Sequence, residues 1–163
     1  MAQKNEVVNP PARQDVIITR VFDAPRELVF KMWTDPALVE KWWGPMGFTN
    51  PVCKLDAKTG GSIRIVMQGP DGTKYPTGGF FNEIVEPERI VFTSIKEGDE
   101  GNAELEVLNT VTFTEENGKT KMSLRAVVTM ETPQACGSID GMHVGWNQSI
   151  DRFAETLTQL INQ

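Results

Sequence analysis

The chain is poor in histidine, cysteine and tyrosine, with one, two and one of each among its 163 residues. One imidazole and two thiols are too few for a structural zinc site of ordinary ligand count, so no metal centre is expected. Basic residues number 16 against 22 acidic ones, which gives a formal charge of −6. That sign disfavours binding to nucleic-acid phosphates and to anionic membrane surfaces. No apolar run approaches the ~20 residues of a membrane-spanning helix.

What is present fits one folded domain. Hydrophobic residues make up 39% of the chain and charged residues 23%, which is enough apolar side chain for a core. Residues 1–14 are polar, contain Asn9-Pro10-Pro11 and are interpreted as a flexible tail, so the domain is expected to span residues 15–163. The first residues lack the basic start and apolar stretch of a secretory signal, which favours a cytoplasmic location and reduced thiols at Cys53 and Cys136.

The first part of the domain has the pattern strand, helix, helix. Beta-branched residues predict a strand over residues 16–22. Asp23-Ala24-Pro25 then opens a helix, because proline fits the first helical position. A second helix follows with Asp35 as its cap, and Gly44-Pro45 ends it. Both helices carry an apolar stripe, made of Leu28, Val29, Met32 and Trp33 in the first and Leu38, Val39, Trp42 and Trp43 in the second.

The stretch from Val52 to about Met130 alternates strands with turns. Gly78-Gly79 predicts a bulge or sharp bend inside one strand, and Asn117-Gly118 predicts a hairpin. No helix-length insert separates these strands, so the sheet is expected to be antiparallel.

A long amphipathic helix is predicted at the end of the chain, beginning at Thr132-Pro133 or at Ser138. The whole order predicts an α+β fold, in which a strongly curved antiparallel sheet of six or seven strands wraps around this C-terminal helix and two short helices follow the first strand. A sheet of that width can cover one helix only by curling, which leaves a space between the two. Either that space is a ligand cavity, or large side chains fill it.

Alternation along the strands and the stripe of the last helix select the residues that face this space. Asn109 is an amide among apolar neighbours, and it either bonds a ligand or a water or lies at a bulge. Gly137, Gly141 and Gly145 thin one side of the helix, for close approach of the sheet or for ligand room. The residues predicted to line the cavity are Trp42, Trp43, Ile65, Met67, Phe80, Phe92, Asn109, Val111, Met130, Met142, His143, Trp146 and Ile150.

The sequence holds no recognisable catalytic, metal or cofactor motif, and no cofactor is expected. The lone histidine, His143, follows Met142 on the apolar stripe and is interpreted as a packed or rim residue. Cys136 lies seven positions before it. That spacing is about 10.5 Å of helical rise, too far for a thiol–imidazole contact.

Several segments together resemble one known family. They are residues 21–30 (VFDAPRELVF), 33–36 (WTDP), 42–45 (WWGP), 79–93 and 141–146 (GMHVGW). Over about residues 15 to 162 the chain is similar to single-domain homologues of the heat-shock protein 90 ATPase activator, within the START-like, SRPBCC superfamily. The resemblance implies the helix-grip fold of the birch-pollen allergen, with a deep apolar cavity for lipids, polyketides, hormones or other hydrophobic molecules.

Three functions are compatible with this pattern. The leading hypothesis is cofactor-free binding of a small hydrophobic ligand between the sheet and the terminal helix. The second is an enzyme of cyclase or hydrolase type in the same cavity, for which Asn109 and His143 are the named candidates. The third is a regulatory module that acts on a chaperone partner. A homodimer is also expected, because an exposed edge strand needs cover.

Overall fold

The computed structural model describes residues 15–98, 100–135 and 141–163. The predicted tail, residues 1–14, lies outside the described residues. So do Cys136, Gly137 and Ser138, the last of which was one of two expected starts of the terminal helix.

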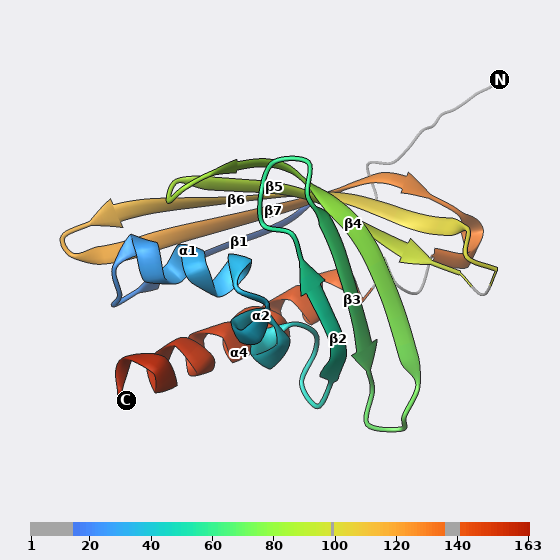
Figure 1. Ribbon diagram of the computed structural model, residues 1–163, viewed down its shortest axis with the longest axis horizontal. Helices are drawn as coiled ribbons and strands as arrows, with labels where there is room; N and C mark the ends of the chain where they lie inside the picture. Colours follow the sequence, from blue (N-terminus) through green and yellow to red (C-terminus); the bar gives the residue numbers. More distant parts are fainter. Residues whose placement is uncertain (1–14, 99, 136–140) are drawn as a thin grey trace, which may run out of the picture.

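The described chain forms one seven-stranded antiparallel sheet and three α-helices, in the expected order (Figure 1). The elements are β1 (Val16–Phe22), α1 (Arg26–Thr34), α2 (Pro36–Trp42), β2 (Thr49–Leu55), β3 (Ser62–Gln68), β4 (Lys74–Val85), β5 (Arg89–Glu97), β6 (Ala103–Glu116), β7 (Lys119–Glu131), the short 3-10 helix η3 (Pro133–Ala135) and α4 (Met142–Ile161). Neighbouring strands follow the order β1-β7-β6-β5-β4-β3-β2, so β1 and β2 are the edges.

The sheet curves over α4, which runs along its concave side together with α1 and α2 (Figure 1). The predicted bend in β4 occurs at Gly79, where φ is +150°. A Cβ at this position would lie 2.0 Å from the backbone oxygen of Thr93, so the two strands approach too closely for any side chain. A register shift follows between Phe81 and Glu83. This architecture is the helix-grip fold.

Aromatic side chains fill the core between the helices and the sheet. The rings of Trp33 and Trp42 lie 4.7 Å apart, and those of Trp42 and Phe153 lie 5.0 Å apart. The indole Nε1 of Trp42 donates to the backbone oxygen of Met32 at 2.9 Å, so this fully buried ring keeps its hydrogen bond. The apolar stripes of α1 and α2 thus serve mainly to anchor both helices under the sheet.

The last helix does not begin at Thr132-Pro133, one of its two expected starts. Thr132 and Pro133 open only the short η3, in which the N–H of Ala135 donates to the backbone oxygen of Thr132, and α4 starts at Met142. Ala135 is fully buried, which ties this turn to the end of the sheet.

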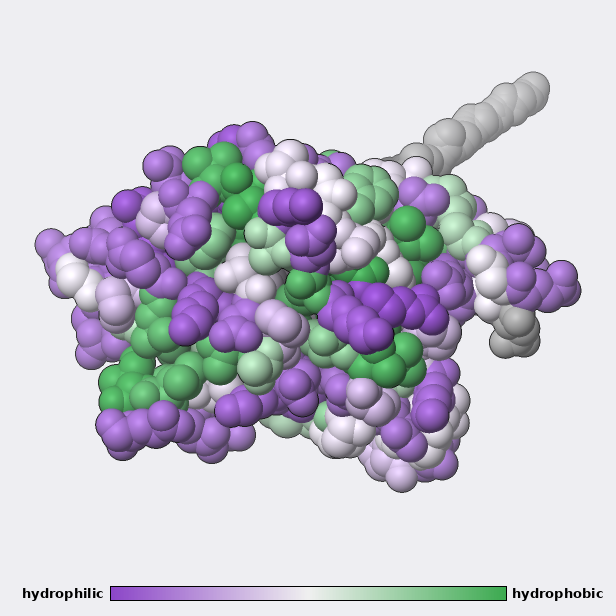
Figure 2. Space-filling model, in the orientation of Figure 1, coloured by the Kyte–Doolittle hydropathy of each residue, from purple (hydrophilic) through white to green (hydrophobic). Residues whose placement is uncertain are grey.

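No helix in the described part of the chain is long and apolar enough to cross a membrane. On the face shown in Figure 2, hydrophilic groups dominate and hydrophobic groups reach the surface in separate patches.

Candidate functional site

A cavity of about 400 Å³ lies between the first turns of α4 and the concave face of the sheet. This volume falls within the range of ~300–1,000 Å³ typical of small-molecule sites. Most of its wall is apolar or aromatic, with a few hydroxyl groups and one lysine. The residues that line it are Trp43, Gly44, Pro45, Phe48, Met67, Tyr75, Thr77, Ser94, Lys96, Leu105, Val107, Gly141, Met142, Gly145, Trp146 and Ser149.

One end of the cavity is formed by the segment that follows α2. The rings of Trp43 and Trp146 meet edge to face with centroids 5.5 Å apart, which joins this segment to α4. Gly44 has φ +95°, and a Cβ there would lie 3.0 Å from Sδ of Met67. The glycine of the Trp-Trp-Gly-Pro segment is therefore favoured by its backbone conformation, and a Cβ there would also press on the side chain of Met67.

Arg152 of α4 holds this segment in place. Its Nη1 lies 3.0, 2.9 and 2.9 Å from the backbone oxygens of Trp43, Gly44 and Pro45, and its Nη2 donates to the backbone oxygen of Lys41 at 3.1 Å. Burial lowers the pKa of the guanidinium, against the opposing effect of the Glu155 carboxylate. An arginine remains protonated regardless, so it serves as a permanent donor to these carbonyl groups.

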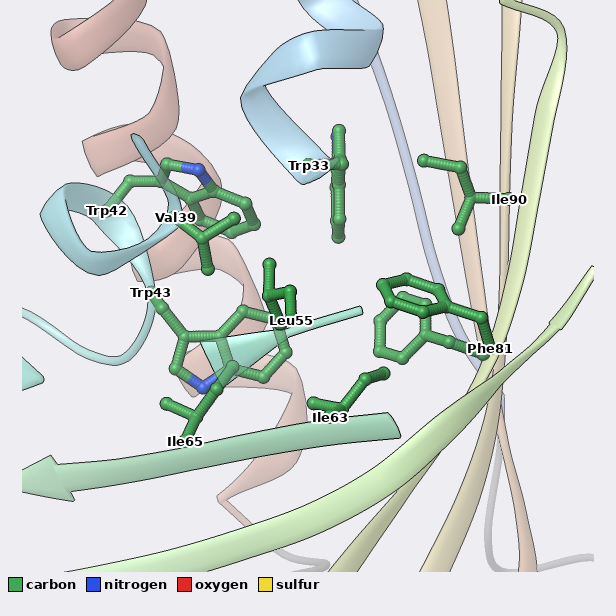
Figure 3. Close-up of a pocket in the computed structure, with 10 residues that line it drawn as sticks. Trp33, Val39, Trp42, Trp43, Leu55, Ile63, Ile65, Phe81 and Ile90 are labelled. Atoms are coloured by element: carbon green, nitrogen blue, oxygen red, sulfur yellow. The ribbon is translucent and has the colours of Figure 1, made fainter. Parts of the chain in front are cut away.

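A second, much smaller pocket of about 20 Å³ lies among buried residues of the core (Figure 3). Trp33 from α1 and the two tryptophans at the end of α2 face Ile63, Ile65 and Phe81 of the sheet across it (Figure 3). About one water molecule would fit in that volume, but the wall offers it almost no polar partner. Trp43 lines both spaces.

The sheet also places a buried amide beneath the cavity floor. Asn109 is fully buried, and its Nδ2 lies 3.3 Å from the backbone oxygen of Phe92, 3.2 Å from that of Val107 and 3.2 Å from Oγ of Ser94. Its Oδ1 has no partner among the described residues. The sequence left two roles open for Asn109, a bond to a ligand or water and a place at a bulge. In the structure its side chain contacts Ser94 and Val107, which line the cavity, but Asn109 itself is not part of the cavity wall.

The structure brings four of the predicted lining residues together at the main cavity, namely Trp43, Met67, Met142 and Trp146. Trp42, Ile65 and Phe92 line the small inner pocket with Trp43. Asn109, Val111 and Ile150 are fully buried and line neither space.

Three predicted residues lie away from both spaces. Phe80 is 42% exposed, because it pairs with Thr93 on the outer face while its neighbour Phe81 pairs with Phe92 inside. Met130 is opposite Glu106, and Val128 is opposite Val107, so Thr129 is an extra residue that turns Met130 to the other face of the sheet. His143 is exposed at the start of α4, where its Nδ1 lies 3.3 Å from Nδ2 of Asn147.

Sequence reasoning missed part of the lining. Leu105 and Val107 are apolar residues that alternate with Glu104, Glu106 and Leu108 along β6, so alternation was a usable signal for both. Gly141 and Gly145, for which ligand room was one of two expected roles, also line the cavity, and Ser149 follows them one turn further along α4. Phe48, Tyr75, Thr77, Ser94 and Lys96 also line the cavity, and no pattern in the sequence marks them as inward-facing.

The site holds no paired nucleophile and base among the described residues. Burial raises the pKa of the Cys53 thiol to about 11, with a smaller effect from the Glu40 carboxylate, so this thiol is largely protonated at neutral pH. Asn109 is buried in β6 and His143 is exposed on α4, so the structure does not join the two candidates of the enzyme hypothesis. Within the described ranges, no group of three His, Cys, Asp or Glu side chains could hold a metal ion.

The chain is similar in sequence to one protein family and in fold to several solved structures. Residues 23–158 match the family model described as Activator of Hsp90 ATPase homolog 1-like protein. No curated protein matches the chain. A crystal structure from Nitrosomonas europaea is 24% identical with a TM-score of 0.76, over 91% of this chain and 97% of that one.

Two further solved structures extend the likeness over most of the chain. A solution structure from Arthrobacter aurescens is 25% identical with a TM-score of 0.78, over 89% of this chain and 86% of that one. The AHSA1 protein from Silicibacter pomeroyi is 24% identical with a TM-score of 0.74, over 90% and 99%. At this identity the likeness concerns the fold.

Proposed function

This chain belongs to the Activator of Hsp90 ATPase homolog 1-like family, and from that premise we propose that it binds a small hydrophobic ligand, without a cofactor, in the cavity between α4 and the sheet. The observation that supports the proposal is the space of about 400 Å³ walled by Trp43, Met67, Leu105 and Trp146. Moving apolar ligand surface from water into such a site is favourable by roughly 25 cal/mol per Å².

Hydrogen bonds to α4 fix the segment that forms one end of the cavity. Arg152 and the hydroxyl of Ser149, which accepts from the N–H of Gly44 at 3.0 Å, fix the segment that carries Trp43. A wall that is already ordered loses little conformational freedom on binding, which favours affinity.

A test can use the helix glycine that faces the cavity. A Cβ at Gly145 would meet only Cγ of Pro45, at an ordinary contact distance of 3.9 Å. Gly145→Phe therefore adds a ring inside the cavity, whereas Gly145→Ala adds one methyl group. Val144 is 59% exposed, so Val144→Phe puts a ring on the outside of the same helix turn.

Intrinsic tryptophan fluorescence is then titrated with oleic acid, ethylnaphthalene and an aromatic polyketide. The proposal expects saturable binding of at least one compound to the wild type, Gly145→Ala and Val144→Phe, with a loss of at least about tenfold in Gly145→Phe. Equal binding by the two phenylalanine variants would place the ligand elsewhere. Absence of binding for the whole panel would count against a ligand carrier.

A regulatory contact with a chaperone ATPase is the second candidate. Its support is the family description, which names an activator of the Hsp90 ATPase. A pull-down with purified Hsp90 at low salt tests it, and failure to retain the chaperone would remove this candidate.

A further inference from the structure

The inward-facing side chains of β5 change from apolar to polar along the strand. Ile90 and Phe92 are buried in the core, whereas Ser94 and Lys96, at the next two inward positions, line the cavity. Lys96 is directly opposite Leu105, itself a buried member of the cavity wall, so both lie on the concave face of the sheet. Lysine is rarely placed on an inward-facing surface unless it is paired, so its presence at this position calls for a partner.

That partner is a carboxylate supplied by an irregularity in the neighbouring strand. Lys96 pairs with Leu105 and Glu97 pairs with Ala103, so Glu104 is an extra residue between them. Its Oε1 lies 3.3 Å from Nζ of Lys96. Lys96 lines the cavity, whereas Glu104 is not part of its wall. An ammonium group has three N–H donors, and Glu104 occupies one of them.

Ser94 adds a second donor near Lys96. The Asn109 amide is oriented by the backbone oxygens of Phe92 and Val107, both of which require its Nδ2 to point toward them. The same Nδ2 lies 3.2 Å from Oγ of Ser94, so its two hydrogens are shared among three acceptors. An amide nitrogen cannot accept a hydrogen bond, so the hydrogen of the Ser94 hydroxyl is not directed at Asn109 and remains available. The cavity wall therefore includes two residues that carry hydrogen-bond donors, the hydroxyl of Ser94 and the ammonium group of Lys96, beside otherwise mostly apolar side chains.

We infer that the ligand is an apolar molecule with one terminal acceptor oxygen, a carbonyl or a carboxylate, and that this oxygen binds at Ser94 and Lys96. This inference rests on the proposed function and adds the chemical class of the ligand and its orientation. The apolar body lies against Trp43, Met67 and Trp146. A ligand without the acceptor oxygen would cover these donors and leave them unpaired, which weakens binding roughly ten- to hundredfold.

Three probes of nearly the same shape separate the possibilities. Naphthoic acid carries a carboxylate, acetonaphthone a neutral carbonyl group, and ethylnaphthalene no oxygen. Isothermal titration calorimetry of each probe is made with the wild type, Ser94→Ala, Lys96→Met and the double variant. Lys121→Met is the matched control, since Lys121 is exposed on β7 and lines neither pocket. Retained affinity for ethylnaphthalene shows that each variant keeps a folded cavity.

The expected result is that one or both oxygen-bearing probes bind the wild type and Lys121→Met at least about tenfold more tightly than ethylnaphthalene. An advantage limited to the acid identifies a carboxylate ligand, and an advantage for both probes identifies any acceptor oxygen. The double variant should lose that preference while still binding ethylnaphthalene. Equal affinity for all three probes in the wild type overturns the inference but leaves apolar binding intact. Persistence of the preference in the double variant overturns the assigned residues, and failure of all three probes to bind overturns the inference together with the proposed function.

Discussion

Replacing Arg152 with alanine is expected to destabilise the protein and loosen one wall of the cavity. The guanidinium contacts four backbone oxygens of residues 41 and 43–45. Three of these oxygens share the two hydrogens of Nη1, so the contacts amount to about three hydrogen bonds. At about 1 kcal/mol each, the free energy of unfolding should fall by ~3 kcal/mol.

Arg20 provides the matched control for this substitution. Its Nη2 lies 2.8 Å from Oδ1 of Asp151, in a pair whose carboxylate side chain is 53% exposed. Exposed ion pairs contribute about 0–1 kcal/mol, so Arg20→Ala should reduce stability far less than Arg152→Ala. Urea unfolding followed by circular dichroism measures both. If the two variants lose stability equally, Arg152 does not fix the segment between α2 and β2, and the account of a preformed cavity wall fails.

Three further outcomes follow from backbone geometry and burial. Gly79→Ala should lower the free energy of unfolding by ~3 kcal/mol or more, because the added Cβ would collide with the backbone oxygen of Thr93. Gly60→Ala is the control: its φ is also positive, at +85°, but nothing lies within 4 Å of the added Cβ, so the loss should be only about 1 kcal/mol. Urea or thermal unfolding measures both, and equal losses would refute the collision. Gly145→Ala should raise the free energy of urea unfolding by about 0.5–1 kcal/mol through helix propensity, and a loss would mean that the added methyl group is not accommodated. In a Cys136→Ser background, native Cys53 should react with iodoacetamide at pH 8 roughly a hundredfold more slowly than after unfolding, because burial raises its pKa to about 11. Since the unfolded thiol loses its proton at a lower pH than the native one, the free energy of unfolding should decline as the pH rises from 9 to 11. A native rate equal to that of the unfolded chain would show that the thiol is not shielded.

The fold could be predicted because its signals are local and repeated. Asn117-Gly118 was expected to form a hairpin, and both residues have positive φ, 54° and 80°, at the turn between β6 and β7. Every second residue of β6 from Leu105 to Phe113 is buried, which is the periodicity that alternation along a strand predicts. The start of α4 could not be located because an apolar stripe fixes which side of a helix is buried but not where its first turn forms.

The site was predictable only where periodicity is unbroken. Met142 and Trp146 lie one turn apart on α4, so their common orientation follows from helical spacing. Met130 was placed on the inner face because alternation was extended through Thr129, where the pairing of two strands inserts an extra residue. Ser94 and Lys96 could not be predicted, because polar residues in a strand normally indicate its solvent-exposed face, and nothing in the sequence shows that these two lie on the inner face.

The position of β1 has a consequence for synthesis on the ribosome. Val16 pairs with Ala126, and Phe22 pairs with Thr120, so the first strand to emerge has as its sheet neighbour the last strand made. In a nascent chain β1 therefore has no strand to pair with until residues 119–131 have been translated, and contacts between residues so far apart in sequence form slowly. Truncated chains that end before β7 would lack the surface on which the N-terminal strand settles, and they should be prone to aggregate rather than stop at a stable partial domain.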